Sequence, residues 1–155
     1  VETRLKNIEA GEMAATFLAA AGLKRLGLLN RARAILSPDD MLPAVCQGAI
    51  GIECRDDDTG TRSLLAAIDH NETGICVIAE RAFLAALDGS CRTPIAGLAT
   101  IKGDILSLRG LIVRPDGSET LAAQRDGNLA EAGTLGRLLG EGLHERAGPG
   151  FFDEE

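Results

Sequence analysis

Residues 95–124 decide the fold, and they read IAGLATIKGDILSLRGLIVRPDGSETLAAQ. Apolar side chains recur here with the alternation that is typical of strands with one buried face. Two short connections, KGD at 102–104 and RPDG at 114–117, are turn-forming sequences at hairpin spacing. The pattern therefore predicts a three-stranded antiparallel meander, with strands at 95–101, 105–113 and 119–124.

Helical patterns flank this meander on both sides. Residues 75–87 carry a nearly continuous apolar stripe that ends at Asp88-Gly89, a common helix stop. Residues 129–146 alternate leucines with charged side chains. We therefore expect helices packed against the sheet in a compact α+β domain over residues 71–148, followed by a frayed tail over 149–155.

The first 70 residues have a weaker pattern. Leu5, Ile8 and Met13 are spaced as in a short helix, whereas the apolar run at 14–21 fits a buried strand or a buried helix equally well. The alternation over 49–54 predicts a strand, and Thr61 could cap a helix that runs to about residue 69. These elements do not obviously close a core, so we expect an incomplete α/β segment here.

Composition narrows the class of protein. The net charge is −7, Tyr and Trp are absent and Phe occurs four times, which argues against a surface that binds nucleic acid. No apolar stretch is long enough to cross a bilayer and no signal-peptide pattern occurs, so we expect a soluble, cytoplasmic protein, and a monomer. The four cysteines lack zinc spacing, and His70 and His144 stand outside any ligand motif, so we expect free thiols and no metal.

Charge is divided unevenly along the chain. Residues 1–36 carry six Lys or Arg against three Glu, whereas residues 37–155 carry ten against twenty Asp or Glu. Gly22 and Gly27 fit a glycine turn and a helix start within this basic segment, where backbone N–H groups could meet an anion. The segment is therefore a candidate anion site, and the alternative is a set of solvated charges on helix surfaces.

Three stretches resemble porphobilinogen deaminases, a family also called hydroxymethylbilane synthases. Residues 42–55, LPAVCQGAIGIECR, are similar to the family's LPAVGQGALGIECR segment, with Cys46 in place of its usual Gly. ERAF at 80–83, followed by GSCRTPI at 89–95, resembles the family's cofactor-attachment region, and AAAGLKRLG at 19–27 resembles a third segment. The order and separations of the three stretches agree with the family.

The resemblance implies a three-domain transferase of tetrapyrrole and heme biosynthesis, which joins four porphobilinogen units into hydroxymethylbilane with release of ammonia. It implies that residues 1–48 end the second domain, 49–66 return to the first, and 71–148 form the C-terminal domain that carries the cofactor. The family's first domain, with its catalytic Asp, would precede Val1. We therefore expect no catalytic residue in this chain, little turnover from it alone, and a missing N-terminal domain of the same enzyme as its partner.

The resemblance also assigns the site residues. Cys91, in a loop just past a helix end, would carry the dipyrromethane cofactor through a thioether, and Arg92 beside it would favour the thiolate. From the local pattern alone, Cys91 fits a small buried side chain as well as it fits a reactive attachment thiol. Contacts with the cofactor and with the growing polypyrrole chain, which carry many carboxylates, would fall on Arg4, Arg25, Ala19, Gly22 and Gln47.

The remaining candidates receive no chemical role. Cys46, Cys54 and Cys76 are interpreted as core or incidental thiols, and the acidic residues Glu53, Asp69 and Glu80 as surface or structural groups. An alternative function, of a different class, is an independent binding or interaction domain over residues 71–148 with a reactive thiol.

Overall fold

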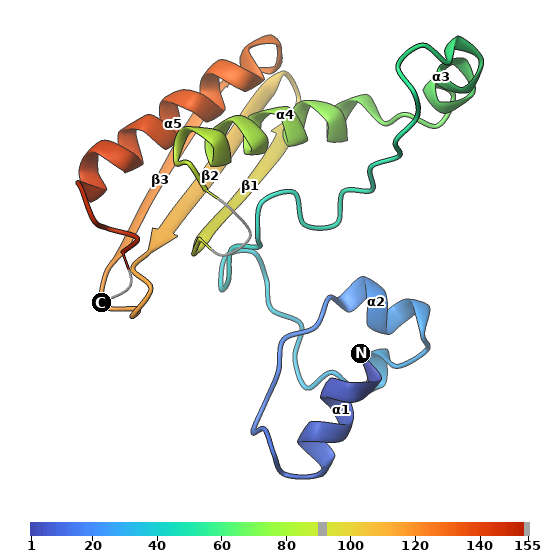
Figure 1. Ribbon diagram of the computed structural model, residues 1–155, viewed down its shortest axis with the longest axis vertical. Helices are drawn as coiled ribbons and strands as arrows, with labels where there is room; N and C mark the ends of the chain where they lie inside the picture. The colour runs from blue at the N-terminus through green and yellow to red at the C-terminus, as the bar shows by residue number, and fades with distance from the viewer. Residues whose placement is uncertain (90–92, 154–155) are drawn as a thin grey trace. The chain divides into compact units, whose positions relative to one another are not determined.

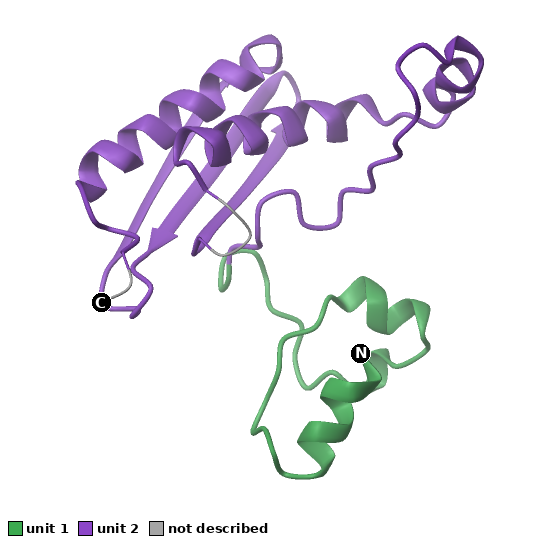
Figure 2. Ribbon diagram, viewed as in Figure 1, with its two compact units in different colours: residues 1–41 green, residues 42–155 purple. Residues whose placement is uncertain are grey.

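The computed structural model describes residues 1–89 and 93–153. The chain divides into two compact units, Val1–Met41 and Leu42–Glu155 (Figure 2). Among the described residues, only the second unit contains a sheet.

The second unit is built on a three-stranded antiparallel sheet of order β1-β2-β3 (Figure 1). Its strands are β1 (Ile95–Lys102), β2 (Ile105–Val113) and β3 (Thr120–Asn128), which confirms the predicted meander. Gly103 and Gly117 have φ values of 61° and 76° in the two hairpin turns, a conformation that glycine adopts without steric cost. β3 runs beyond its predicted end at 124 because β2 still offers backbone partners there, although the side chains are no longer apolar.

Two long helices cover one face of this sheet (Figure 1). They are α4 (Asn71–Ala86) and α5 (Ala132–Ala147), the latter preceded by a short 3-10 turn, η2 (Leu129–Glu131). The core between helices and sheet includes Phe83, Leu106, Leu108, Ile112, Leu139 and Leu143. The α+β architecture expected for this part of the chain is therefore confirmed.

Glycines allow the two helices to approach closely. A Cβ placed on Gly136 of α5 would lie 2.0 Å from the carbonyl oxygen of Ala79 on α4. A Cβ on Gly140, one turn further along, would lie 2.6 Å from the Cβ of Ala86. No side chain larger than hydrogen fits at either position, so these glycines set the spacing of the helix pair.

The segment after α5 is more ordered than expected. Residues 149–155 were predicted to fray, but Phe151 is only 2% exposed and belongs to the core. The guanidinium carbon of Arg114 lies 4.9 Å from the centre of its ring, and Phe152 meets it edge-on at 5.2 Å between ring centres. The prediction was wrong for the described residues 149–153, because a single buried aromatic residue is enough to hold a short segment.

Residues 42–70 precede α4 and contain one helix, α3 (Thr59–Ala66). Thr61 was expected to cap this helix, but the cap is Asp58, whose carboxylate accepts the backbone N–H of Thr61 at 3.0 Å. The strand predicted over 49–54 is not formed, because the described structure offers that segment no strand to pair with. Its apolar side chains are instead exposed, Ile50 at 91%.

The first unit is helical and has little core. It contains α1 (Glu2–Glu9), α2 (Ala20–Arg25) and a 3-10 turn, η1 (Leu29–Arg31). The short helix near Leu5 is confirmed, whereas the apolar run at 14–21 is mostly irregular, with α2 beginning only at Ala20. Leu23 is the buried hydrophobic residue of this unit. None of the helices described in either unit is both long and apolar enough to cross a membrane.

Candidate functional site

The residues assigned to the site fall in both units. Arg4, Ala19, Gly22 and Arg25 belong to the first unit, and Gln47 belongs to the second. Cys91 lies outside the described residues, between the end of α4 and the start of β1 in sequence. The structure therefore brings four of the assigned positions into one compact unit.

Within the first unit, Arg4 connects α1 with the segment that leads into α2. Its Nη1 donates a hydrogen bond of 3.1 Å to the carbonyl oxygen of Phe17. Ala19 is the N-cap of α2, and its carbonyl oxygen accepts the N–H groups of Gly22 at 3.0 Å and Leu23 at 3.2 Å. Three of the assigned positions thus belong to one hydrogen-bonded local structure.

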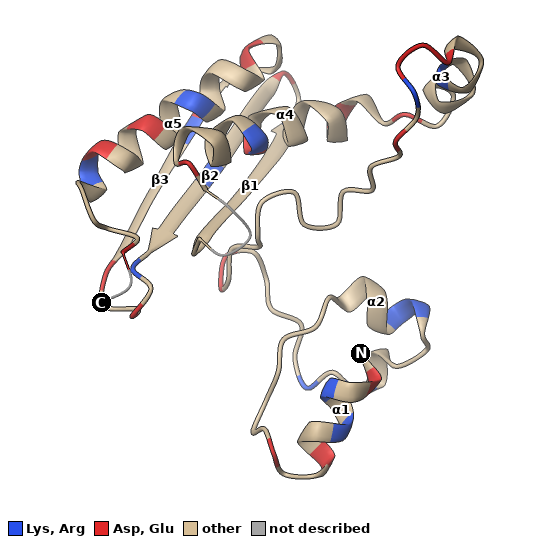
Figure 3. Ribbon diagram, in the orientation of Figure 1, with Lys and Arg blue, Asp and Glu red and all other residues tan. Residues whose placement is uncertain are grey.

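The first unit carries both basic and acidic residues, and the helix α2 carries only basic ones (Figure 3). Arg31 forms an ion pair with Glu9, which links η1 to α1. Lys24 and Arg25 lie in the last turn of α2 and are exposed, as is Arg4. Cations are favourable at a helix C-terminus, so the charge of α2 has a structural reason in addition to any ligand. Exposed guanidinium groups such as those of Arg4 and Arg25 are suited to carboxylate-rich ligands.

Gln47 lies in a tight turn over residues 44–49, which we call the Gln47 turn. The N–H of Gln47 donates to the carbonyl oxygen of Ala44 at 3.0 Å, and that of Ala49 donates to Cys46 at 3.2 Å. The φ value of Cys46 is 59°, in the left-handed region where a side chain is disfavoured. This backbone conformation suits Gly, the residue found in the segment that 42–55 resembles, better than it suits Cys. The side chain of Gln47 is exposed and available for contact.

The Gln47 turn is attached to the edge of the sheet. Just before it, the carbonyl oxygen of Pro43 accepts the N–H of Gly97 at 3.0 Å, and Ala44 forms an isolated antiparallel bridge with Ala96. At the turn itself, the N–H of Cys46 donates to Oε2 of Glu80 at 2.6 Å. The turn is therefore held against β1 by both backbone and side-chain hydrogen bonds.

Glu80 is a buried charged residue whose partners sequence reasoning missed. It was interpreted as surface or structural, and it is structural: its side chain is buried, with 6% of the residue exposed. Its second oxygen, Oε1, accepts the N–H of Ala99 in β1 at 2.7 Å. The available signal was a carboxylate within an otherwise apolar helical stretch, since a buried charge requires hydrogen-bond partners.

The described residues on either side of Cys91 are closely fixed. Asp88 has a φ value of 49°, and a Cβ on Gly89 would lie 2.5 Å from Cδ1 of Ile95 and 2.6 Å from Cδ1 of Leu84. On the other side, the carbonyl oxygen of Pro94 accepts the N–H of Val113 at 3.0 Å. The chain therefore leaves α4 and enters β1 along defined paths.

Two of the three described cysteines, Cys46 and Cys76, are poor candidates for a reactive thiolate. Burial, followed by the negative charge of Glu80, raises the pKa of the Cys46 thiol, and the same two causes raise the pKa of the Cys76 thiol. Both thiols are therefore protonated at neutral pH. Cys54 is exposed but has no assigned role.

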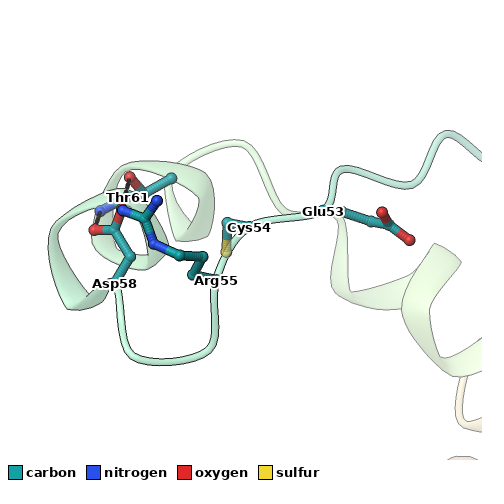
Figure 4. A pocket seen from close by; sticks show the side chains of 5 residues that line it. All are labelled: Glu53, Cys54, Arg55, Asp58 and Thr61. Carbon is teal, nitrogen blue, oxygen red and sulfur yellow. Dashed lines mark hydrogen bonds and ion pairs between the residues drawn. The ribbon is translucent and has the colours of Figure 1, made fainter.

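One surface hollow in the second unit is lined by Glu53, Cys54, Arg55, Asp58 and Thr61 (Figure 4). Its polar groups already engage one another, because Arg55 pairs with Asp58 at 3.4 Å and Asp58 caps α3. The hydrogen bonds from Thr61 lower the pKa of Asp58 and keep this cap ionised. Among the described residues, no group of three or more His, Cys, Asp or Glu side chains could hold a metal ion.

Comparison with known proteins assigns the chain to a family. Residues 1–63 match the family model described as the dipyromethane cofactor binding domain of porphobilinogen deaminase, and residues 74–145 match the model of its C-terminal domain. The porphobilinogen deaminase of Paracoccus denitrificans is 59% identical over 153 residues, which is 99% of this chain and 49% of the relative. That of Nitrobacter hamburgensis is 52% identical over 152 residues, 98% of this chain and 48% of the relative.

The chain thus spans about half the length of the curated relatives it matches. The two matched regions lie one after the other and together include Arg4, Arg25, Gln47 and Cys91. With both domain models in the order of the sequence and an alignment along nearly all of its residues, this chain belongs to the porphobilinogen deaminase family.

Proposed function

We propose that this chain forms the cofactor-carrying half of a porphobilinogen deaminase, a transferase that joins four porphobilinogen units into hydroxymethylbilane with release of ammonia. The observation that carries the proposal is the 59% identity to the Paracoccus denitrificans enzyme over 153 residues. The other half of the enzyme, with the catalytic carboxylate, would be contributed by its N-terminal domain. On this proposal the chain alone has little or no turnover.

Cys91 is the proposed attachment point of dipyrromethane. Attachment requires a nucleophilic sulfur that a bulky pyrrole can reach, and Cys91 follows α4 and precedes β1 in the sequence. The two described thiols whose pKa is raised by burial, Cys46 and Cys76, do not compete for this role. When bound, dipyrromethane supplies the free pyrrole carbon to which porphobilinogen units are added.

The basic segment over residues 1–36 fits the chemistry of that group, because each pyrrole carries an acetate and a propionate. Arg4 and Arg25, both exposed, would bind these carboxylates through their guanidinium groups, which stay charged at any working pH. Ala19 and Gly22 would contribute backbone contacts near the cofactor, and Gln47 a polar side chain. These residues would neutralise the charge of the growing chain. Proton transfer would belong to the catalytic carboxylate of the N-terminal domain.

Intact mass is the first test. An added mass equal to two linked pyrroles, mapped to a peptide that contains Cys91, would establish attachment, and Cys91→Ala should abolish it. An unmodified chain in which iodoacetamide labels Cys91 would show that this half does not acquire the group unaided.

Turnover is the second test, and it uses a hybrid in which the upstream half of the Paracoccus relative is joined to this chain. The hybrid should consume porphobilinogen and carry dipyrromethane on Cys91. An inactive hybrid that is folded and loaded would contradict the proposed activity. A folded hybrid without the added mass would contradict the attachment.

Location and assembly are part of the same proposal. We propose a cytoplasmic monomer, which is supported by the composition, in which charged residues make up 25%. Light scattering of the hybrid should give the mass of one copy.

The alternative function, an independent interaction domain, is supported by the separate hydrophobic core of the second unit. It would be favoured if the hybrid had no activity while the second unit bound a partner protein.

A further inference from the structure

Glu80 joins two segments of backbone that otherwise diverge. Each of its carboxylate oxygens accepts one N–H: Oε2 that of Cys46 at 2.6 Å and Oε1 that of Ala99 at 2.7 Å. The donors lie on different segments, one in the Gln47 turn and the other in β1. The residue is 6% exposed, so water contributes little to satisfying this charge.

The position of the carboxylate follows from the path of the chain beside β1. The backbone runs along the edge of β1 for a short distance, where Pro43 accepts the N–H of Gly97 and Ala44 bridges Ala96. At Cys46, with a φ value of 59°, the chain turns away from the strand. The next outward N–H of β1, that of Ala99, then meets the Glu80 carboxylate instead of a backbone carbonyl.

We propose that Glu80 is a positioning residue, whose buried carboxylate holds the Gln47 turn against β1 and so fixes where the Gln47 side chain is presented. The inference rests on the proposed function, because it takes Gln47 as a contact of the cofactor or the growing chain. Glu80 itself touches neither. It acts through the N–H of the residue next to Gln47, and two hydrogen bonds to an ionised carboxylate give it the strength to do so.

A purely structural role would have a different signature. If Glu80 only satisfied polar groups in the core, its loss would weaken the whole second unit to the same degree everywhere. If it holds the turn, its loss opens the turn locally while the sheet and α5 remain closed. Hydrogen exchange separates these two outcomes.

The first experiment measures amide exchange in this chain, for the wild type, Glu80→Gln and the control Glu145→Gln, an exposed glutamate on α5. An amide side chain cannot accept both N–H groups, because one of its ends is a donor. Exchange at Cys46, Gln47 and Ala49 should become roughly 10- to 100-fold faster in Glu80→Gln, relative to the amides of β2. Unchanged rates in the turn, or a uniform rise that includes β2, would overturn the inference. If Glu80→Gln does not fold, Glu80→Asp gives the same comparison, since it keeps the charge but shortens the reach.

The second experiment is a double-mutant cycle in the hybrid enzyme, using Glu80→Gln and Gln47→Ala. If Glu80 acts through the Gln47 turn, each single variant lowers kcat, and the double variant is no slower than Gln47→Ala alone. Multiplicative losses, or a Gln47→Ala variant with wild-type kcat, would refute the positioning role. A wild-type hybrid without turnover refutes the proposed function instead, and the exchange experiment on this chain still decides whether Glu80 holds the turn.

Discussion

Replacing Gly136 by Ala should destabilise the second unit, although the same change in an isolated helix is stabilising. An added Cβ would lie 2.0 Å from the carbonyl oxygen of Ala79, 2.9 Å from its carbonyl carbon and 3.0 Å from the Cβ of Ala82. The nearest atom is backbone, so it cannot rotate away. The two helices would have to separate by about 1.5 Å to restore an ordinary contact distance.

The magnitude follows from two opposing terms. Overpacking of this kind costs about 1–3 kcal/mol, and a clash with backbone belongs at the upper end of that range. The better helix propensity of Ala returns about 1 kcal/mol. We therefore expect Gly136→Ala to lower the free energy of unfolding by about 2 kcal/mol.

Gly142 provides a matched control on the same helix. It is exposed, and a Cβ built on it would have no atom within 4 Å. Only the propensity term applies, so Gly142→Ala should raise the free energy of unfolding by about 1 kcal/mol. The two variants have the same chemistry and opposite expected signs.

Urea denaturation followed by circular dichroism at helical wavelengths would measure both changes, with the slope against urea checked for constancy. Thermal melts should differ by several degrees in the same order. A Gly136→Ala variant as stable as the wild type would refute the close approach of α4 and α5. A loss of stability in Gly142→Ala would refute the propensity argument.

Three further predictions concern the second unit. Cys46→Gly should raise the free energy of unfolding in urea by up to about 1 kcal/mol, because Gly tolerates the φ value of 59° that a side chain disfavours. A clear loss of stability in this variant would show that packing of the thiol outweighs the backbone strain. His70 caps α4 by accepting the N–H of Thr73 on Nδ1 at 3.3 Å. His70→Ala should therefore lower the free energy of unfolding in urea by about 1 kcal/mol, whereas His70→Asp should restore the cap. Equal stabilities for the wild type and both variants would contradict this role. Burial raises the folded-state pKa of the Cys76 thiol, so the contribution of this thiol to stability is present at neutral pH and is lost as pH rises through the thiol range. Iodoacetamide should label the exposed Cys54 before Cys76, and the reverse order would count against the burial of Cys76.

The regular part of the fold was predictable because its signals are local. Alternation of apolar residues identified the strands, and turn sequences with Gly103 and Gly117 fixed the hairpins. The two long helices followed from apolar stripes and a glycine stop. Each of these signals lies within a few residues of the element that it predicts.

The failures concern elements whose state depends on distant partners. Residues 49–54 alternate as a strand does, but alternation indicates only a surface suited to pairing, and the described structure supplies no strand beside it. Phe151 looked like part of a tail, because nothing in its neighbourhood in sequence reveals the buried site that it fills. Thr61 was predicted to cap the helix that Asp58 caps, and only the backbone geometry of the helix start reveals the true cap.

The candidate site shows the same difference between signals that are local in sequence and contacts between distant residues. The motifs that resemble the family contain Arg25, Gln47 and Cys91 and are contiguous in sequence, and the resemblance assigns Arg4 as well. The partners of Glu80 lie 34 and 19 positions away, and no pattern in the sequence joins them. Resemblance therefore suggested candidates for contact with the ligand, whereas the hydrogen bonds of Glu80 beside Gln47 were found only from the structure.

The short pairing between Ala44 and Ala96 has a consequence for solubility. β1 is an edge strand, and its outward N–H and C=O groups would accept a strand from another molecule if they were uncovered. The segment beside it occupies part of that edge, and the Glu80 carboxylate occupies the next donor. The opposite edge, β3, carries Gln124, Arg125 and Asp126, whose polar side chains discourage sheet extension. Release of the Gln47 turn would thus open the more apolar of the two edges, and self-association of the protein through β1 would follow.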